Sequence, residues 1–169
     1  MVLVFVERGP ARKAAIDAVE LRLGTRLPAP FRNLLTTVSN GGEVEPAAAQ
    51  SAPAVGVVAV LGAERGDHLD IESRLAQYAG DRLPPGLIPV IDAEGGNLVC
   101  LSLRPDDFGT VWFWDHEQER AGHAVTMLAA GFDDFLDDLA PPAPNEEPGS
   151  VVEAWIDPSL RAELDGDKS

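Results

Sequence analysis

The sequence predicts a single α+β domain in which a mainly antiparallel sheet is packed by helices. Three short apolar runs between Leu87 and His116 predict consecutive strands, because each is bounded by Gly, Asp, Asn or Pro. Segments before and after these runs repeat their apolar residues at helical spacing instead. A chain of 169 residues suits one domain and buries roughly 70% of its unfolded surface without needing a metal or a disulfide.

The three runs cover residues 87–92, 98–103 and 110–116, and we predict that they form an antiparallel meander. Successive side chains of a strand point to opposite faces, and the middle run is apolar on both. It is therefore predicted to be a central strand. Trp112 and Trp114 share a face of the third strand, where each indole can bury about 200 Å². They either anchor a helix in the core or form a hot spot for a partner.

Helical spacing of apolar residues predicts four helices. The first contains Ile16 and Val19 and is ended by Gly24, which readily adopts the left-handed conformation of a helix end. The second begins at Pro30, whose missing N–H is harmless in a first turn. The predicted ranges are 11–23, 30–38, 132–139 and, with a sparser apolar stripe, 64–78, ended by Gly80.

Two further strands are predicted, over residues 2–6 and 56–62, from runs of aliphatic residues. Residues 43–53 are rich in Ala and Pro and show no period, so we predict a loop or a mobile insertion there. The charged residues 67–70 are predicted to form a solvated loop. All of these segments except residues 2–6 lie between the second helix and the meander.

The domain is predicted to span residues 1–140. Residues 141–149 are rich in Pro and predict a stiff, extended linker. Residues 150–169 form an acidic tail, in which Ser150 and Glu153 have the spacing of a capping box and predict a short helix. Two alternatives are open: the tail docks back onto the domain, or it offers an amphipathic ligand to another chain.

The net charge of −15 is unevenly distributed, because residues 133–169 contain eleven acidic and two basic residues, a net charge of −9. No basic stripe is present, which argues against direct binding of nucleic acid. Strong negative charge steers a basic protein partner at long range. The alternative is that the charge serves solubility alone.

Cysteine content and hydropathy bear on the compartment. Cys100 is the only cysteine, which excludes an intramolecular disulfide and favours a reducing, cytoplasmic location. No run reaches the roughly 18 apolar residues of a membrane span. The apolar residues 1–6 have no basic segment before them and are too short for a signal peptide. We expect no association with a membrane.

Candidates for catalysis or metal binding are weak. The charged end of the third strand of the meander offers metal ligands whose spacing matches no established signature: Asp115, His116, Glu117, Glu119 and His123. Cys100 with a histidine is the only candidate nucleophile and base, and a thiol in an apolar strand is usually inert. The turn at Gly95-Gly96-Asn97 lacks the lysine and helix of a phosphate loop. We expect no catalytic residue, cofactor or metal.

Two groups of motifs carry a resemblance to a known family. The first group is Glu20, Leu23-Gly24, Leu27-Pro28, Phe31-Arg32, Leu34-Leu35 and Asn40-Gly41-Gly42. The second is Ile88-Pro89-Val90, Gly95-Gly96-Asn97, Cys100-Leu101 and the run from Gly109 to Glu117. In this order and spacing, from about Ile16 to Leu139, they resemble the SUKH superfamily, the bacterial immunity and fungal cell-wall-assembly-regulator domain.

The resemblance implies a twisted, mainly antiparallel sheet packed by helices, in agreement with the patterns above. It implies no catalytic residues, and it makes Gly41, Gly42, Gly95 and Gly96 structural residues of turns. Many bacterial members are thought to bind and neutralise a toxin domain, often a nuclease. The resemblance therefore implies a non-enzymatic immunity protein. The alternative is a regulatory scaffold that recruits a cellular enzyme.

On the immunity hypothesis, an acidic face binds a basic toxin domain, without direct contact to nucleic acid or membrane. The oligomeric state is left open. The residues expected to contribute to the partner-binding face are Asp106, Asp107, Asp115, Glu117, Asp133, Asp134, Asp137 and Asp138.

Overall fold

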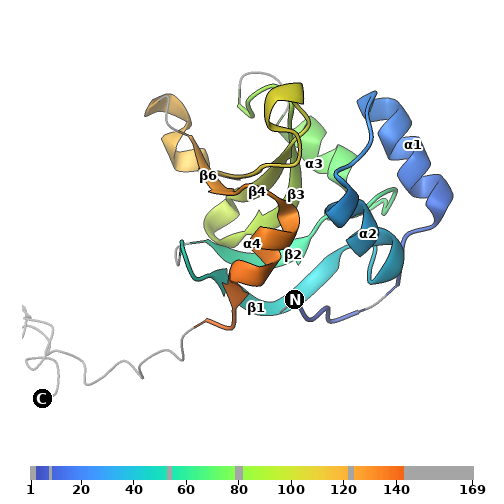
Figure 1. Cartoon of the computed structure of the whole chain (residues 1–169), viewed down its shortest axis with the longest axis horizontal. Coiled ribbons are helices and arrows are strands. Elements are labelled where there is room, and N and C mark those ends of the chain that lie inside the picture. Colours follow the sequence, from blue (N-terminus) through green and yellow to red (C-terminus); the bar gives the residue numbers. More distant parts are fainter. Residues whose placement is uncertain (1–2, 8, 53–54, 79–81, 122–123, 143–169) are drawn as a thin grey trace, which may run out of the picture.

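A curled antiparallel sheet organises the chain, and helices pack around it in an α+β fold (Figure 1). The computed structural model describes residues 3–7, 9–52, 55–78, 82–121 and 124–142. In these residues the sheet has seven strands in the order β6-β5-β4-β3-β2-β1-β7, with all neighbours antiparallel. The strands are β1 (Gly42–Ala49), β2 (Gly56–Val60), β3 (Leu87–Ala93), β4 (Leu98–Ser102), β5 (Val111–Trp114), β6 (Val125–Ala129) and β7 (Leu139–Ala140).

The helices lie within or close to the predicted segments, and their apolar faces pack against the sheet. They are α1 (Lys13–Leu23), α2 (Ala29–Thr37), α3 (Ile71–Gln77) and α4 (Phe132–Asp138). Three short 3₁₀ turns connect strands: η1 (Glu94–Gly96), η2 (Pro105–Asp107) and η3 (His116–Ala121). Gly24 ends α1 in the left-handed conformation, with φ of 73°, and Pro30 lies in the first turn of α2, as predicted.

The predicted meander is confirmed as β3, β4 and β5. All five residues of β4 are buried, so this strand is covered on both faces as its apolar pattern predicted. The four motif glycines all have positive φ, which confirms their expected role in turns: 73° at Gly41, 130° at Gly42, 72° at Gly95 and 82° at Gly96.

The larger hydrophobic cluster lies between the sheet and α1, α2 and α4. Phe31 of α2 and Phe132 of α4 meet edge to face, with ring centroids 5.3 Å apart. Ile16 and Val19 of α1 are fully buried in the same cluster. Figure 1 shows these three helices side by side, with α4 in orange next to the blue α2.

The smaller cluster lies on the opposite face of β4 and β5. It contains Trp114, Cys100 and Leu98, which share this face because their strand positions are in register. Tyr78 and Leu83 cover them from the segment that follows α3. We call the side of the sheet that carries this cluster the tryptophan face.

The family motifs in α1 and α2 hold the two helices together. The Glu20 carboxylate accepts hydrogen bonds from the Leu27 N–H at 3.0 Å and from Arg32 Nε at 3.1 Å. Charge-assisted hydrogen bonds of this kind are the stronger ones in proteins. These motif residues therefore fix the connection between the two helices.

The prediction of a loop at residues 43–53 is wrong, because most of this segment forms β1. Val44, Ala47 and Ala49 are buried, but alanine contributes little to an apolar pattern. Pro46 also suggested a break. It lies where the β1–β2 register shifts between Glu43 and Ala47, and a bulge tolerates a residue without an N–H.

The predicted helix over 64–78 is too long at its start. α3 begins at Ile71, because the Asp70 carboxylate caps it by accepting from the N–H groups of Glu72 and Ser73 at 3.1 and 3.0 Å. Residues 64–69 form a loop, as the prediction for 67–70 expected. Its predicted solvation holds for Asp67 and His68 but not for Leu69 and Asp70, which are buried.

Other segments differ from the predictions or lie outside the described residues. The predicted strand at 2–6 is reduced to a single bridge between Phe5 and Val44. β6 was not predicted. Helix α4 ends at Asp138, since Leu139 starts β7. Gly80 and most of the predicted linker and tail, residues 143–169, lie outside the described residues.

Candidate functional site

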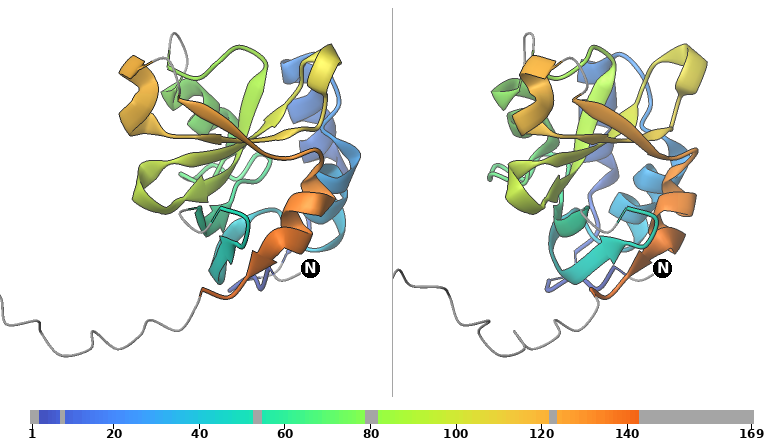
Figure 2. Two further views of the ribbon diagram at one scale, coloured as in Figure 1. Left: turned by 60° about the vertical axis from the view of Figure 1, so that its left-hand side comes forward. Right: turned by 90° about the vertical axis from the view of Figure 1, so that its left-hand side faces the viewer.

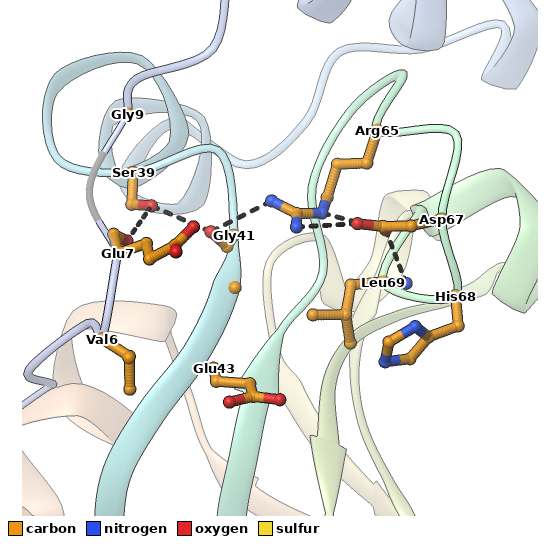
Figure 3. Close-up of a pocket in the computed structure, with 11 residues that line it drawn as sticks. Val6, Glu7, Gly9, Ser39, Gly41, Glu43, Arg65, Asp67, His68 and Leu69 are labelled. Atoms are coloured by element: carbon orange, nitrogen blue, oxygen red, sulfur yellow. Dashed lines mark hydrogen bonds and ion pairs between the residues drawn. The ribbon is translucent and has the colours of Figure 1, made fainter.

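A cleft of about 430 Å³ lies between the N-terminal segment, the turn into β1 and the loop before α3 (Figure 3). Three segments that are distant in the sequence meet there because β1 and β2 are neighbours in the sheet. The polar side chains that line the cleft are Glu7, Ser39, Glu43, Arg65, Asp67 and His68.

Close contacts between backbones form one wall of the cleft. A Cβ on Gly41 would lie 2.5 Å from the Val60 carbonyl oxygen, and one on Gly62 would lie 2.1 Å from the Asn40 carbonyl oxygen. The Asn40 side chain joins the same two segments, since its Nδ2 donates to the Ala63 carbonyl at 2.9 Å and its Oδ1 accepts from the Ala63 N–H at 2.8 Å. No side chain fits at either glycine, so the motif Asn40-Gly41 shapes this wall.

Arg65 crosses the cleft and fixes the loop before α3. Its Nη1 donates to the Asn40 carbonyl at 2.8 Å and to the Gly41 carbonyl at 3.3 Å. Its Nε and Nη2 donate to the two oxygens of Asp67 at 3.1 and 2.9 Å, and Figure 3 shows the bonds to Gly41 and Asp67. Asp67 also accepts from the Leu69 N–H at 2.9 Å. The hydrogen bonds from Arg65 lower the pKa of Asp67, so this carboxylate stays charged in an ion pair.

The cleft has no arrangement suited to nucleophilic catalysis among the side chains described. The Ser39 hydroxyl donates to the Gly41 carbonyl at 2.9 Å rather than to a base. In the described part of the chain, no group of three His, Cys, Asp or Glu side chains could hold a metal ion. The exposed carboxylates of Glu7 and Glu43 form no ion pair with a described residue. With Asp67 they outnumber Arg65, so the cleft attracts positively charged groups.

Asp106 and Asp107 lie in η2, in the loop between β4 and β5. Asp107 accepts from Ser102 Oγ at 2.6 Å, Arg104 Nε at 2.9 Å and Trp112 Nε1 at 3.1 Å. Arg104 is the main reason that the pKa of Asp107 falls to about 2. Asp106 is exposed and makes no hydrogen bond to a described residue. Asp107 therefore stabilises the loop, and Asp106 is the one with a free carboxylate.

Asp115 and Glu117 lie at the other end of β5. Asp115 accepts from the Glu117 N–H at 2.9 Å and from Gln118 Nε2 at 2.8 Å, which caps η3. His116 Nδ1 is 2.9 Å from Asn97 Oδ1, so the family motif at Asn97 holds this histidine against η1. Of the other metal ligands considered, the Glu119 side chain and all of His123 lie outside the described residues.

The four aspartates of α4 also divide into one that is engaged within the fold and three that are free. Asp138 accepts from the Ser51 N–H at 3.1 Å and from the Ser51 hydroxyl at 2.6 Å, so it ties α4 to the end of β1. Asp133, Asp134 and Asp137 are exposed, and no described side chain pairs with them. These three carboxylates remain available to a partner.

An apolar groove of about 220 Å³ lies where the first turn of α2, the residues after η2 and the start of α4 meet. It runs between Pro28 at the start of α2, Phe108 after η2, and Phe132 at the start of α4. Phe108 is 46% exposed. Three free carboxylates are sequence neighbours of its lining residues, because Asp106 precedes Phe108 by two residues and Asp133 and Asp134 follow Phe132; Asp137 lies in the last turn of the same helix. We call this groove, with Asp106, Asp133, Asp134 and Asp137, the acidic corner.

The structure thus divides the eight predicted binding residues instead of gathering them on one face. Asp107 and Asp138 are engaged within the fold. Asp115 and Glu117 lie at the far end of β5 from η2, and Figure 2 shows η2 and α4 on one side with η3 on the other. The acidic corner holds the remaining four.

The two tryptophans, predicted to be either core residues or a hot spot for a partner, lie in different environments. Trp114 is fully buried: its indole N–H donates to the Arg82 carbonyl at 3.1 Å, and its ring meets Tyr78 edge to face at 5.0 Å. Trp112 is half-buried, and the Arg104 guanidinium lies 5.4 Å from its ring centroid. Trp114 is a core residue, whereas Trp112 keeps one side open.

Cys100 is fully buried on the tryptophan face, as its position in an apolar strand predicted. Burial raises the pKa of its thiol well above the usual value, because the thiolate would lose its hydration. A neutral, enclosed thiol is unsuited to nucleophilic attack.

Sequence reasoning missed the cleft. Its main residues, Glu7, Glu43 and Arg65, lie far apart along the chain, and Glu43 was assigned to a loop. The motif Asn40-Gly41-Gly42 was recognised as a turn. Gly62 could have pointed to the cleft, because a glycine at the end of a strand often marks a place where another backbone segment approaches closely.

Comparisons with known proteins agree with this architecture. The profile of the SMI1/KNR4 family (SUKH-1) matches residues 10–138. The chain is also 28% identical over 96 residues to the SPbeta prophage-derived uncharacterized protein YokK of Bacillus subtilis (strain 168), a match that covers 56% of this chain and 48% of that protein. The chain thus spans about half the length of this curated relative. No helix in the described residues is both long and apolar enough to cross a membrane. The family match covers most of the chain, including the four helices of the described residues and every strand of the sheet except β7, so the chain belongs to the SMI1/KNR4 family (SUKH-1).

Proposed function

We propose that this chain is a non-enzymatic immunity protein that binds a basic toxin domain through the acidic corner. SUKH domains are in general non-catalytic immunity or regulatory proteins that act through protein interactions. A prophage-derived relative is compatible with a role in conflict between bacteria or phages. A cytoplasmic location and the absence of direct contact to nucleic acid are part of the proposal.

The observation that carries the proposal is the set of unpaired carboxylates on the two segments, η2 and α4, that adjoin an apolar groove. Some other surface carboxylates are paired, as Asp67 is with Arg65 and Glu72 with Arg22, whereas Glu7 and Glu43 at the cleft are not. At the acidic corner, Asp106, Asp133 and Asp137 have no such partner. An exposed apolar centre with a charged rim is the usual composition of a protein interface.

Helix α4 supports the same conclusion through its own electrostatics. The C-terminal end of a helix carries partial negative charge, so Asp137 in the last turn is disfavoured by about 0.3–1 kcal/mol. Its neighbour Asp138 is compensated by Ser51, but Asp137 has no compensating partner in the described structure. A residue whose charge lowers the stability of its own helix is a candidate for binding.

The test uses the protein encoded beside the gene for this chain. We expect that protein to arrest growth when expressed alone in a bacterial host, and co-expression of this chain to restore growth. The double variant Asp133→Lys/Asp137→Lys should abolish protection and weaken binding at least about tenfold by calorimetry, because it reverses the charge at the corner. Its effects on the helix dipole oppose each other at the two ends of α4, so the fold should persist.

The matched control is Glu7→Lys/Glu43→Lys, which makes the same change of charge at the cleft. It should leave protection intact. If the control abolishes protection and the corner variant does not, the toxin binds at the cleft. If the neighbouring protein is harmless or does not bind this chain, the immunity function is rejected.

A further inference from the structure

One edge of β6 is unpaired in the described structure. β6 is the last strand of the sheet, and only β5 pairs with it. Its residues, Val-Thr-Met-Leu-Ala, include no charge, proline or glycine. Native sheets usually protect an edge with such residues or with a covering segment, because an open edge recruits other strands. β6 lies on the side of the molecule away from α1 and α2 (Figure 1).

The backbone groups that face outward can be assigned from the register. The Asp115 N–H donates to the Ala124 carbonyl at 2.8 Å, so the backbone groups of Ala124 face β5. Backbone groups alternate between the two edges of a strand. The N–H and C=O groups of Val125 and Met127 therefore point away from β5. The register then shifts beside Leu128, which ends the regular part of the edge.

The side chains at this edge form an incomplete apolar row. Pro89, Cys100, Trp112 and Met127 stand opposite one another on β3, β4, β5 and β6, on the tryptophan face. Burial decreases along the row, because Cys100 is fully buried, Trp112 is half-buried and Met127 is 53% exposed. A further strand beside β6 would place an apolar side chain against Met127 and continue the row.

Carboxylates lie beyond both ends of this edge. Val125 stands opposite Trp114, so the start of β6 lies near Asp115 and Glu117. Ala129 stands opposite Val111, which places the other end toward η2 and Asp106. Glu117 and Asp106 are exposed and form no ion pair with a described side chain. The edge thus has an apolar, uncharged centre and a negative charge near each end.

We propose that the outer edge of β6 binds an extended segment of the protein partner, which adds to the sheet as an eighth strand. The complementary segment is apolar in its centre and carries a basic residue toward each end. Main-chain hydrogen bonds supply affinity in strand addition, and side chains supply specificity. The inference rests on the proposed function and adds a binding mode to it. It also gives a role to Asp115 and Glu117, which lie away from the acidic corner.

The test is amide hydrogen exchange of the full chain with the peptide acetyl-Lys-Thr-Ile-Thr-Val-Thr-Lys-amide. Without peptide, the amides of Val125 and Met127 should exchange quickly, and that of Thr126, which faces β5, slowly. With peptide at about ten times its dissociation constant, exchange at Val125 and Met127 should slow about tenfold. The same peptide with Glu in place of Lys should bind more weakly.

The decisive variant is Met127→Pro, which removes an outward N–H but no hydrogen bond to β5. It should abolish the protection of Val125, and Met127→Lys should weaken binding of the basic peptide. Val58→Lys is the matched control, since Val58 is 47% exposed on β2, and it should have no effect. Protection that survives Met127→Pro, or peptide binding without protection at these amides, would overturn the inference.

Two outcomes separate this inference from its alternatives. If Val125 and Met127 are already protected without peptide and the chain is a dimer by light scattering, a second copy occupies the edge and the inference fails. If Met127→Pro leaves toxin protection intact while Asp133→Lys/Asp137→Lys removes it, the proposed function stands and strand addition is rejected.

Discussion

The two faces of the central sheet are closed by different amounts of chain. On one face, α1, α2 and α4 form a continuous cover, in which Phe31 and Phe132 are almost completely buried. On the tryptophan face, the cover is the segment that follows α3, with Tyr78 and Leu83. Burial there is complete at Trp114 and decreases to Met127 at the edge. A sheet face that its own chain covers incompletely is where an added strand gains most by burying apolar surface.

The largest expected effect compares the two tryptophans, which share one face two residues apart. Trp114→Ala should lower the free energy of unfolding by about 3–5 kcal/mol, because it empties a closed site and removes the contact with Tyr78. Trp112→Ala should cost about 1–2 kcal/mol, since one side of its ring already faces solvent. Urea denaturation of both variants measures the difference. Equal losses would show that the tryptophan face is closed up to β5.

Substitutions of Cys100 test whether water reaches the centre of the tryptophan face. Cys100→Ser should lower the free energy of unfolding by about 1–3 kcal/mol, because a hydroxyl would be buried among apolar side chains. Cys100→Ala is the control and should cost about 1 kcal/mol through the small cavity that it leaves. Thermal unfolding with both variants separates the polar effect from the cavity. A serine variant as stable as the alanine variant would mean that water reaches this site.

The smallest expected effect concerns Asp107, which holds the rim of the tryptophan face through Trp112 and Arg104. Its pKa in the folded protein is about 2, below the ordinary 3.8. The charged form therefore stabilises the fold above about pH 4, and this contribution is lost as the pH falls toward 2. Asp107→Asn should cost about 1 kcal/mol at pH 7, after solvent screening is allowed for, and almost nothing near pH 2. Unfolding curves across this range measure it, and a cost independent of pH would contradict it.

Much of the fold followed from local patterns. The meander was predictable because each strand is strongly apolar and bounded by turn residues, and α1, α2 and α4 because their apolar residues keep a helical period. β1 was not, since Ala47 and Ala49 are weakly hydrophobic and become strand residues only by pairing with β2 and β7. Its proline was read as a break although it occupies a bulge. In α3, Asp70 sets the start of the helix, and composition alone suggested a longer one.

The sequence predicted that the candidate site carries free carboxylates, but it did not predict where on the fold they lie. Net charge predicted carboxylates available to a basic partner, and Asp106, Asp133 and Asp137 have no partner in the described residues. The sequence could not show that Asp107 and Asp138 are engaged by Arg104 and Ser51, because these contacts depend on how loops and strands return to one another. Nor could it show that η2 and η3 lie at opposite ends of β5.

By itself, the sequence determined the class of fold, the family motifs and the excess of negative charge, because periodicity, turn chemistry and composition are local properties. Only the tertiary structure decided that Trp114 is enclosed while Trp112 is half-buried, that Asp115 and Glu117 lie away from the acidic corner, and that the outer edge of β6 is unpaired in the described residues. Each of these depends on which strands become neighbours, and pairing between distant segments is settled when the whole sheet assembles.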